Sequence, residues 1–155
     1  MRRGAPQKIL AVRLSAAMLG VFAGVSLSTF WYAQGTSYLF DDPATCMNCH
    51  VMRDQFDAWN RSSHARSAVC NDCHTPKDFI GKYAVKGING WHHGSAFTTG
   101  GFHEPIRIRP FNREVVIENC VRCHADLSSR MRAFARGDRI DCTQCHRGTG
   151  HEPRR

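Results

Sequence analysis

The longest apolar run of the chain lies near its N-terminus. From Leu14 to Ala33 no residue carries a charge. A helix of about twenty residues spans about 30 Å, the thickness of the hydrocarbon core of a bilayer. Trp31 and Tyr32 stand near the end of the run, as aromatic residues do where a helix meets a membrane surface. The pattern predicts a transmembrane anchor helix over residues 14–34.

Basic residues precede this run and predict its orientation. Residues 1–13 include Arg2, Arg3, Lys8 and Arg13 and no acidic residue. By the positive-inside rule they lie in the cytoplasm, and residues 35–155 form a domain on the periplasmic side of the cytoplasmic membrane. A cleaved signal peptide is the alternative. The length of the run and its bulky aromatic end favour an uncleaved, single-pass anchor.

Beyond the anchor, apolar residues recur at helical spacing in short segments. The spacing predicts helices at Met52–Trp59, Asp78–Trp91 and Leu127–Ala135, whereas β alternation is limited to Ile106–Ile108. We therefore expect a mainly α fold with extensive loops. The helix at Asp78–Trp91 is basic and amphipathic, a pattern of helices that lie on a membrane surface and also of packed helices that cover a cofactor.

All eight cysteines of the chain fall in one repeated motif. The four copies of C-x-x-C-H are Cys46-Met-Asn-Cys49-His50, Cys70-Asn-Asp-Cys73-His74, Cys120-Val-Arg-Cys123-His124 and Cys142-Thr-Gln-Cys145-His146. This is the attachment pattern of c-type haem, in which two thiols bond to one haem edge and the adjacent imidazole binds the iron. Zinc or disulfides are the alternatives, but neither needs a histidine directly after each cysteine pair. The sequence predicts four covalently bound haem c groups.

The spacing and the composition both fit this prediction. The motifs start at residues 46, 70, 120 and 142, which makes two close pairs and suggests two dihaem modules. A net charge of +8 would suggest nucleic acid as a partner, but four charges orient the anchor and about eight haem propionates offset the rest. The haems themselves are expected to form most of the core, since so short a chain cannot enclose them conventionally. Electron relay is the expected function, without nucleic acid.

Further axial ligands are available outside the motifs. The other histidines are His64, His92, His93, His103 and His151. A relay haem needs two strong axial ligands, so His64 and His151 are candidates, each for a haem other than its neighbour in sequence, with solvated surface histidines as the alternative. Met52 follows the first motif by two positions and is either an axial ligand or a packing residue.

Several of these features together resemble the NapC/NirT family of membrane tetrahaem quinol dehydrogenases. They are the anchor, the opening Cys46-Met-Asn-Cys49-His50-Val-Met52, the pair Ser63-His64, and the closing Cys142-Thr-Gln-Cys145-His146-Arg-Gly-Thr-Gly-His151. The resemblance covers residues 13–151. The short spacer with Glu104-Pro-Ile-Arg-Ile and Arg113–Cys120 looks most like the small subunit of cytochrome c nitrite reductases.

The resemblance implies a ligand set. It implies that Met52, rather than His50, binds the first haem. It implies that His151 is the distal ligand of the second haem, opposite His74, and that His64 is that of the fourth, opposite His146. The third haem, with His124, would take its sixth ligand from a lysine of a partner subunit.

The resemblance also implies a quinol site beside the first haem. Lys86 matches a lysine of that site, and His93 stands where the family has an acidic residue. His93, with His92 beside it, would therefore accept a proton from quinol or bind the first iron.

The resemblance thus implies a membrane-bound enzyme subunit that oxidises menaquinol and passes electrons to a periplasmic multihaem nitrite reductase, in a hetero-oligomeric complex that forms ammonia. Donation to another reductase, such as nitrate reductase, is the alternative within the family and predicts four haems with two protein ligands each. A terminal catalytic cytochrome and a purely structural anchor are alternatives of other classes. The sequence offers no substrate clamp for the first of these, and the second does not need four haems.

Overall fold

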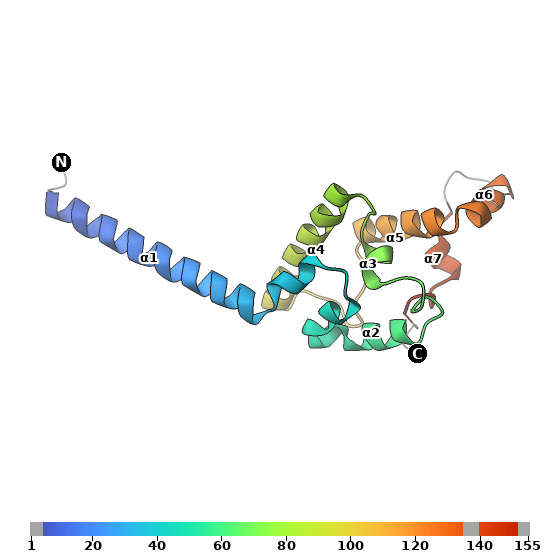
Figure 1. Ribbon diagram of the computed structural model, residues 1–155, viewed down its shortest axis with the longest axis horizontal. Helices are drawn as coiled ribbons and strands as arrows, with labels where there is room; N and C mark the ends of the chain where they lie inside the picture. The colour runs from blue at the N-terminus through green and yellow to red at the C-terminus, as the bar shows by residue number, and fades with distance from the viewer. Residues whose placement is uncertain (1–4, 135–139, 152–155) are drawn as a thin grey trace. The chain divides into compact units, whose positions relative to one another are not determined.

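The computed structural model describes residues 5–134 and 140–151, and every regular element in these ranges is helical (Figure 1). The predicted mainly α fold is confirmed. The chain forms two units, an N-terminal unit, Met1–Phe40, and a C-terminal unit, Asp41–Arg155. Residues 1–4 of the expected cytoplasmic segment, and Ala135 at the end of a predicted helix, lie outside the described residues.

The N-terminal unit is dominated by helix α1 (Ala5–Tyr32). Its segment Pro6–Tyr32 is long and apolar enough to cross a membrane, and none of it is buried within the protein. A core helix of a soluble protein of this composition would be covered by other elements, so the exposed apolar surface agrees with a membrane anchor. The helix starts before the predicted boundary at residue 14 and ends close to the aromatic pair. A short 3-10 helix, η1 (Gly35–Leu39), follows it.

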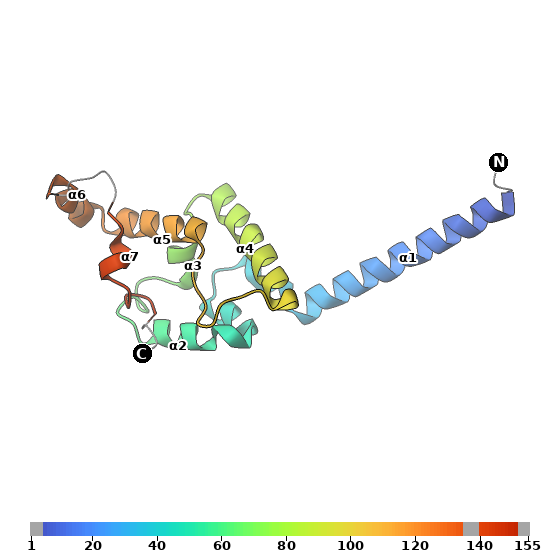
Figure 2. The same ribbon diagram turned by 180° about the vertical axis from the view of Figure 1, so that it is seen from behind.

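The C-terminal unit consists of short helices joined by irregular segments. In chain order these are η2 (Pro43–Asn48), η3 (His50–Met52), α2 (Arg53–Asn60), α3 (Cys70–His74), α4 (Phe79–Thr99), α5 (Pro110–Cys123), α6 (Ala125–Phe134) and α7 (Cys142–Cys145). Helix α3 packs against α5, which also contacts α6 and α7, while η2 lies against α2 (Figures 1 and 2). The two pairs of motifs therefore lie in one packed unit, as expected for a single tetrahaem domain.

Polar caps fix where these helices begin. The Asp78 side chain accepts a hydrogen bond from the Gly81 backbone N–H at 2.7 Å and starts α4. The helix ends at Gly100, whose φ of 69° is the left-handed conformation that suits glycine. Asp141 caps α7 through the backbone N–H of Thr143 at 3.0 Å. An ion pair of 2.6 Å between Arg113 and Asp141 ties α7 to α5.

Helix α4 has two different sides. Phe79, Ile80 and Trp91 are 76%, 80% and 75% exposed, whereas Val85 on the other side is buried. The predicted amphipathic helix is confirmed. It continues beyond Trp91, to Thr99.

Few apolar side chains of the C-terminal unit are buried. Among the described residues they are Ala58, Val85 and Val115, and the polar residues Thr75, Asn119 and Ser128 are buried as well. The central polar contact is made by Asn119 of α5. Its amide donates to the carbonyls of Cys73 and Thr75 at 3.0 and 2.9 Å, which joins α5 to α3.

Substituting Asn119→Ala is expected to lower the free energy of unfolding by about 2–3 kcal/mol, because the carbonyls of Cys73 and Thr75 lose the buried amide that donates to both. Urea unfolding followed by circular dichroism measures the effect. Asn60→Ala is the matched control, since Asn60 is exposed at the end of α2, and it is expected to change the value by less than about 0.5 kcal/mol. Equal effects of the two substitutions would contradict the role given to Asn119.

Candidate haem-binding site

The second, third and fourth C-x-x-C-H motifs each lie on a short helical turn. The second motif forms α3 itself, the third forms the last turn of α5, and the fourth forms α7. Residues three positions apart on a helix lie on the same face, so the two thiols of each of these three motifs are neighbours. In the third and fourth motifs the helix ends at the second cysteine, and the histidine is the first residue beyond it. This is the local geometry that two thioether bonds and one axial imidazole need.

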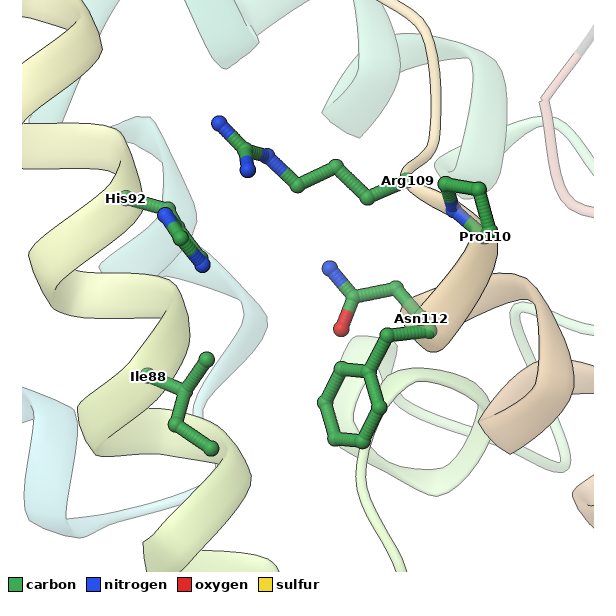
Figure 3. Close-up of a pocket in the computed structure, with 6 residues that line it drawn as sticks. Ile88, His92, Arg109, Pro110 and Asn112 are labelled. Atoms are coloured by element: carbon green, nitrogen blue, oxygen red, sulfur yellow. The ribbon is translucent and has the colours of Figure 1, made fainter.

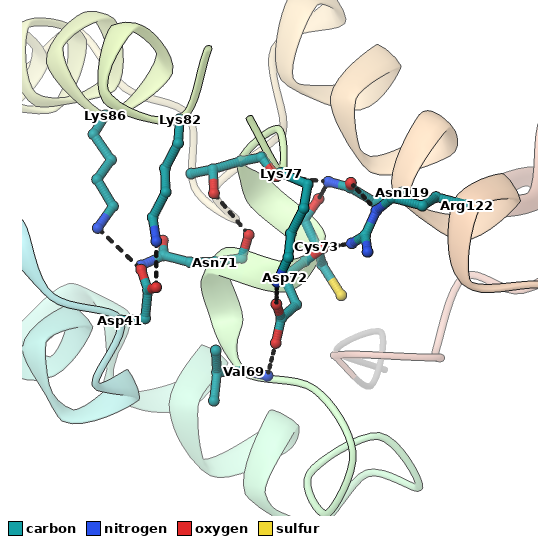
Figure 4. A network of polar contacts seen from close by, with 11 residues as sticks. Asp41, Val69, Asn71, Asp72, Cys73, Lys77, Lys82, Lys86, Asn119 and Arg122 are labelled. Atoms are coloured by element: carbon teal, nitrogen blue, oxygen red, sulfur yellow. Dashed lines mark hydrogen bonds and ion pairs between the residues drawn. The ribbon is translucent and has the colours of Figure 1, made fainter. Parts of the chain in front are cut away.

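The local sequence explains why the second motif is helical. The Asp72 carboxylate accepts a hydrogen bond from the Val69 backbone N–H at 3.0 Å, and the Asp72 N–H donates to the Val69 carbonyl at 2.9 Å. This reciprocal pair caps the first turn of α3 and leaves both motif thiols on the helix. Arg122 of α5 donates to the Asp72 carbonyl at 3.2 Å (Figure 4).

The thiols of successive motifs are neighbours in space. A hydrogen bond joins Cys46 of the first motif to Cys70 of the second; it lowers the pKa of Cys46 and raises that of Cys70. Burial raises the pKa of Cys120, and the neighbouring thiols of Cys142 and Cys73 raise it further. Motif 1 thus adjoins motif 2, motif 2 adjoins motif 3, and motif 3 adjoins motif 4.

His151 lies opposite the motif histidine His74. The centroids of the two rings are 6.0 Å apart and the rings are inclined by 35°. Metal–imidazole bonds of about 2 Å place the centroids of two rings on opposite sides of one metal about 6 Å apart. The Nδ1 atom of His151 is 3.0 Å from the Gln55 carbonyl oxygen, and a proton on Nδ1 leaves Nε2 as the ligand atom. The pair fits a metal bound between them.

His64 lies opposite a different motif histidine from the one that the resemblance implied. Its ring centroid is 6.1 Å from that of His124, in the third motif, at an angle of 72°. The resemblance implied a pairing with His146, in the fourth. Nδ1 of His64 is 3.2 Å from the Ser63 hydroxyl, which again leaves Nε2 for a metal.

The first motif differs from the other three. It lies in the 3-10 helices η2 and η3, where His50 is exposed and Met52 is half-buried. Met52 directly precedes α2, as its N-cap residue. The burial of Met52 agrees with its candidacy as a ligand without testing it.

Lys86 forms an ion pair with an acidic residue, Asp41, that the sequence does not mark as part of the site. Its ammonium lies 3.1 Å from the Asp41 carboxylate, which also pairs with Lys82 (Figure 4). Lys86 is only 15% exposed, and its charge lowers the pKa of Cys46 in the first motif. A single acidic residue so far from Lys86 in the sequence gives no signal of this ion pair, because the pairing depends on the fold.

His92 and His93 lie farther along α4. His92 lines a cavity of about 280 Å³ between α4 and the start of α5 (Figure 3). The other lining residues are Ile88, Arg109, Pro110, Phe111 and Asn112. Desolvation lowers the pKa of His93, and the charges of His92 and Arg109 lower it further. The fifth candidate, His103, is exposed in the segment between α4 and α5.

The alternatives to haem find no support in the geometry. None of the eight cysteines forms a disulfide with another. Within the described residues, no three side chains of the metal-binding types converge on one point that would suit a structural zinc ion. The paired cysteines with an adjacent histidine, and the two opposed histidine pairs, match the donor set of c-type haem instead.

Comparison with known proteins agrees with this donor set. The N-terminal region that defines the NapC/NirT cytochrome c family matches residues 7–155. The chain belongs to the NapC/NirT cytochrome c family. Membership implies covalently bound haem c, and the eight cysteines in four motifs agree with it.

Two relatives show which members of the family this chain is similar to. The chain is 38% identical over 86% of its length to cytochrome c-type protein NrfH of Wolinella succinogenes, and covers 83% of that protein. It is 32% identical over 96% of its length to the cytochrome c nitrite reductase subunit NrfH of Nitratidesulfovibrio vulgaris, and covers 87% of it.

The fold is similar as well. The crystal structure of the cytochrome c nitrite reductase NrfHA complex bound to the HQNO inhibitor contains a chain that matches with a TM-score of 0.63 and 30% identity. The match covers 91% of this chain and 90% of that one. The chain is therefore an NrfH-like member of the NapC/NirT family in both sequence and fold.

Proposed function

We propose that the chain is the membrane-anchored subunit of a nitrite reductase complex, which oxidises menaquinol and relays electrons to a periplasmic catalytic subunit that forms ammonia. The single observation that supports an electron relay is the spatial order of the four motifs, in which each motif adjoins the next. Four haem c groups held in this order would supply one-electron iron chemistry from one end of the unit to the other. The similarity to the two NrfH proteins supports nitrite reduction by a partner.

The proposed axial ligands follow the geometry of the histidine pairs. His74 and His151 hold the second haem, with the ring separation and the Nδ1 hydrogen bond described above. His64 and His124 hold the third haem. His146 of the fourth motif is then the histidine left for a ligand from the partner, and this revises the pairing that the resemblance implied.

The quinol site is proposed at α4, beside the first motif. Lys86 orients the quinol head group, and His93 or His92 accepts a proton, since a neutral imidazole is a base near pH 7. The exposed aromatic side of α4 faces the lipid bilayer, where a lipid-soluble quinol arrives. Only residues 33–40 join α1 to the C-terminal unit, so the anchor keeps this unit at the membrane.

Substituting Lys86→Gln tests this assignment. The rate at which menaquinol reduces the haems is expected to fall by about 100-fold, because the quinol loses the group that orients its head. Anaerobic stopped-flow absorption of the full-length protein in lipid vesicles measures the rate. Lys77→Gln is the matched control, because Lys77 is 72% exposed and makes only a loose ion pair with Asp72 at 3.9 Å. A wild-type rate in Lys86→Gln would remove Lys86 from the quinol site.

A further inference from the structure

Asp41 is the first residue of the C-terminal unit, and its carboxylate interacts with three polar side chains. The ammonium groups of Lys82 and Lys86 both pair with it, Lys86 at 3.1 Å. The side-chain amide of Asn71 donates to the same carboxylate at 2.7 Å (Figure 4). The three partners come from two helices, α3 and α4, far from Asp41 in the sequence.

The charges at this cluster do not cancel. The hydrogen bond from Lys82, followed by those from Lys86 and Asn71, lowers the pKa of Asp41 to about 2, so the carboxylate is ionised at neutral pH. One negative charge therefore faces two ammonium groups. Lys82 and Lys86 are four residues apart on α4, and like charges at that spacing repel each other. Asp41 offsets this repulsion by pairing with both ammonium groups.

The cluster adjoins the first two haem motifs. Asn71 lies within the second motif, directly after Cys70, and Cys70 is hydrogen-bonded to Cys46 of the first. The charge of Lys86 acts on Cys46. The Lys86 ammonium also lies 5.5 Å from the centroid of the Tyr83 ring. Asp41 thus fixes the position of Lys86 relative to the attachment point of the first haem.

We propose that Asp41 is a positioning residue for quinol oxidation, which holds the Lys86 ammonium beside the first haem so that it meets the quinol head group. The inference rests on the proposed function, because it acts through Lys86. Without the carboxylate, the long lysine side chain loses its fixed position and the quinol oxygen loses a preorganised donor.

Substituting Asp41→Asn tests the inference in full-length protein in lipid vesicles. The maximal rate of haem reduction by menaquinol is expected to fall at least tenfold, while the haem content and the absorption spectrum stay unchanged. Asp41→Glu keeps the negative charge and is expected to restore the rate to within threefold of wild type. Asp42→Asn is the matched control, because Asp42 is the neighbouring acid and caps η2 through the Ala44 N–H at 2.9 Å.

The double variant Asp41→Asn/Lys86→Gln separates positioning from a general structural role. If Asp41 acts through Lys86, the double variant is no slower than Lys86→Gln alone, because coupled residues are not additive. Additive losses, or a wild-type rate in Asp41→Asn while Lys86→Gln is slow, would overturn this inference and leave the proposed function intact. A wild-type rate in Lys86→Gln would overturn the quinol site at Lys86 instead. If Asp41→Asn does not fold, Asp41→Glu alone tests the inference. A rate of haem reduction more than threefold below wild type in Asp41→Glu would then contradict it.

Discussion

Replacing His151 with alanine is expected to convert one haem of the four, the second, from low-spin to high-spin iron. A relay haem is low-spin because two strong axial ligands hold the iron, and the alanine variant leaves only His74. The ring centroids of this pair are 6.0 Å apart, which fits one metal between them. Electron paramagnetic resonance of the oxidised protein should show a new high-spin signal equal to one haem.

The matched control for this substitution is His103→Ala. His103 is exposed in the segment between α4 and α5. It is expected to leave the spectrum unchanged. An unchanged spectrum in His151→Ala would contradict the assignment, and a high-spin signal of the same size in both variants would show only that the unit had been disturbed.

Replacing His64 with alanine is likewise expected to produce one high-spin haem, and the question is which one. The ring of His64 is 6.1 Å from that of His124, so the third haem is predicted to change. The variant Cys120→Ser/Cys123→Ser lacks the attachment of that haem and is expected to carry three haems. Adding His64→Ala to this variant should then produce no new high-spin signal.

A pairing of His64 with His146 would give a different result in the combined variant. If His64 binds the fourth haem, the combined variant gains a high-spin signal equal to one haem, as His64→Ala does alone. The mass of the intact protein gives the number of haems in each variant and shows whether the remaining three are attached. The two outcomes therefore separate the pairing with His124 from a pairing with His146.

Much of the organisation was predictable from the sequence, because it depends on local patterns. The uncharged run from Leu14 to Ala33 predicted α1, and the helical periods predicted α2, α4 and α6 close to their observed places. Helix α5 (Pro110–Cys123) was not predicted as a helix, since its apolar residues are interrupted by Arg113, Glu114 and Glu118. Its proline at the first position and its packing against α3 account for it.

The extent of α4 was underestimated for a similar reason. Gly87, Gly90 and Gly94 weaken the helical signal, because glycine is a poor helix former. In the structure these glycines have open space around them, and the helix continues to its cap at Gly100. The caps at both ends and the contacts of its lysines with Asp41 outweigh the low propensity.

In the candidate site, too, the local features were predictable from the sequence and the long-range contacts were not. The motif cysteines and histidines were predictable because their spacing is local. The approach of the His64 ring to that of His124 and the ion pair of Lys86 with Asp41 were not, since each joins residues far apart in the chain through packing. No periodicity or motif distinguishes Asp41 from Asp42 beside it.

The most direct test of the proposed function is the reduction of the isolated full-length protein by menaquinol without any partner. Under anaerobic conditions in lipid vesicles, we expect menaquinol to reduce the haems at a rate that saturates with quinol concentration. Dithionite gives the total of reducible haem for comparison. Haems that dithionite reduces fully but menaquinol leaves oxidised would contradict the account.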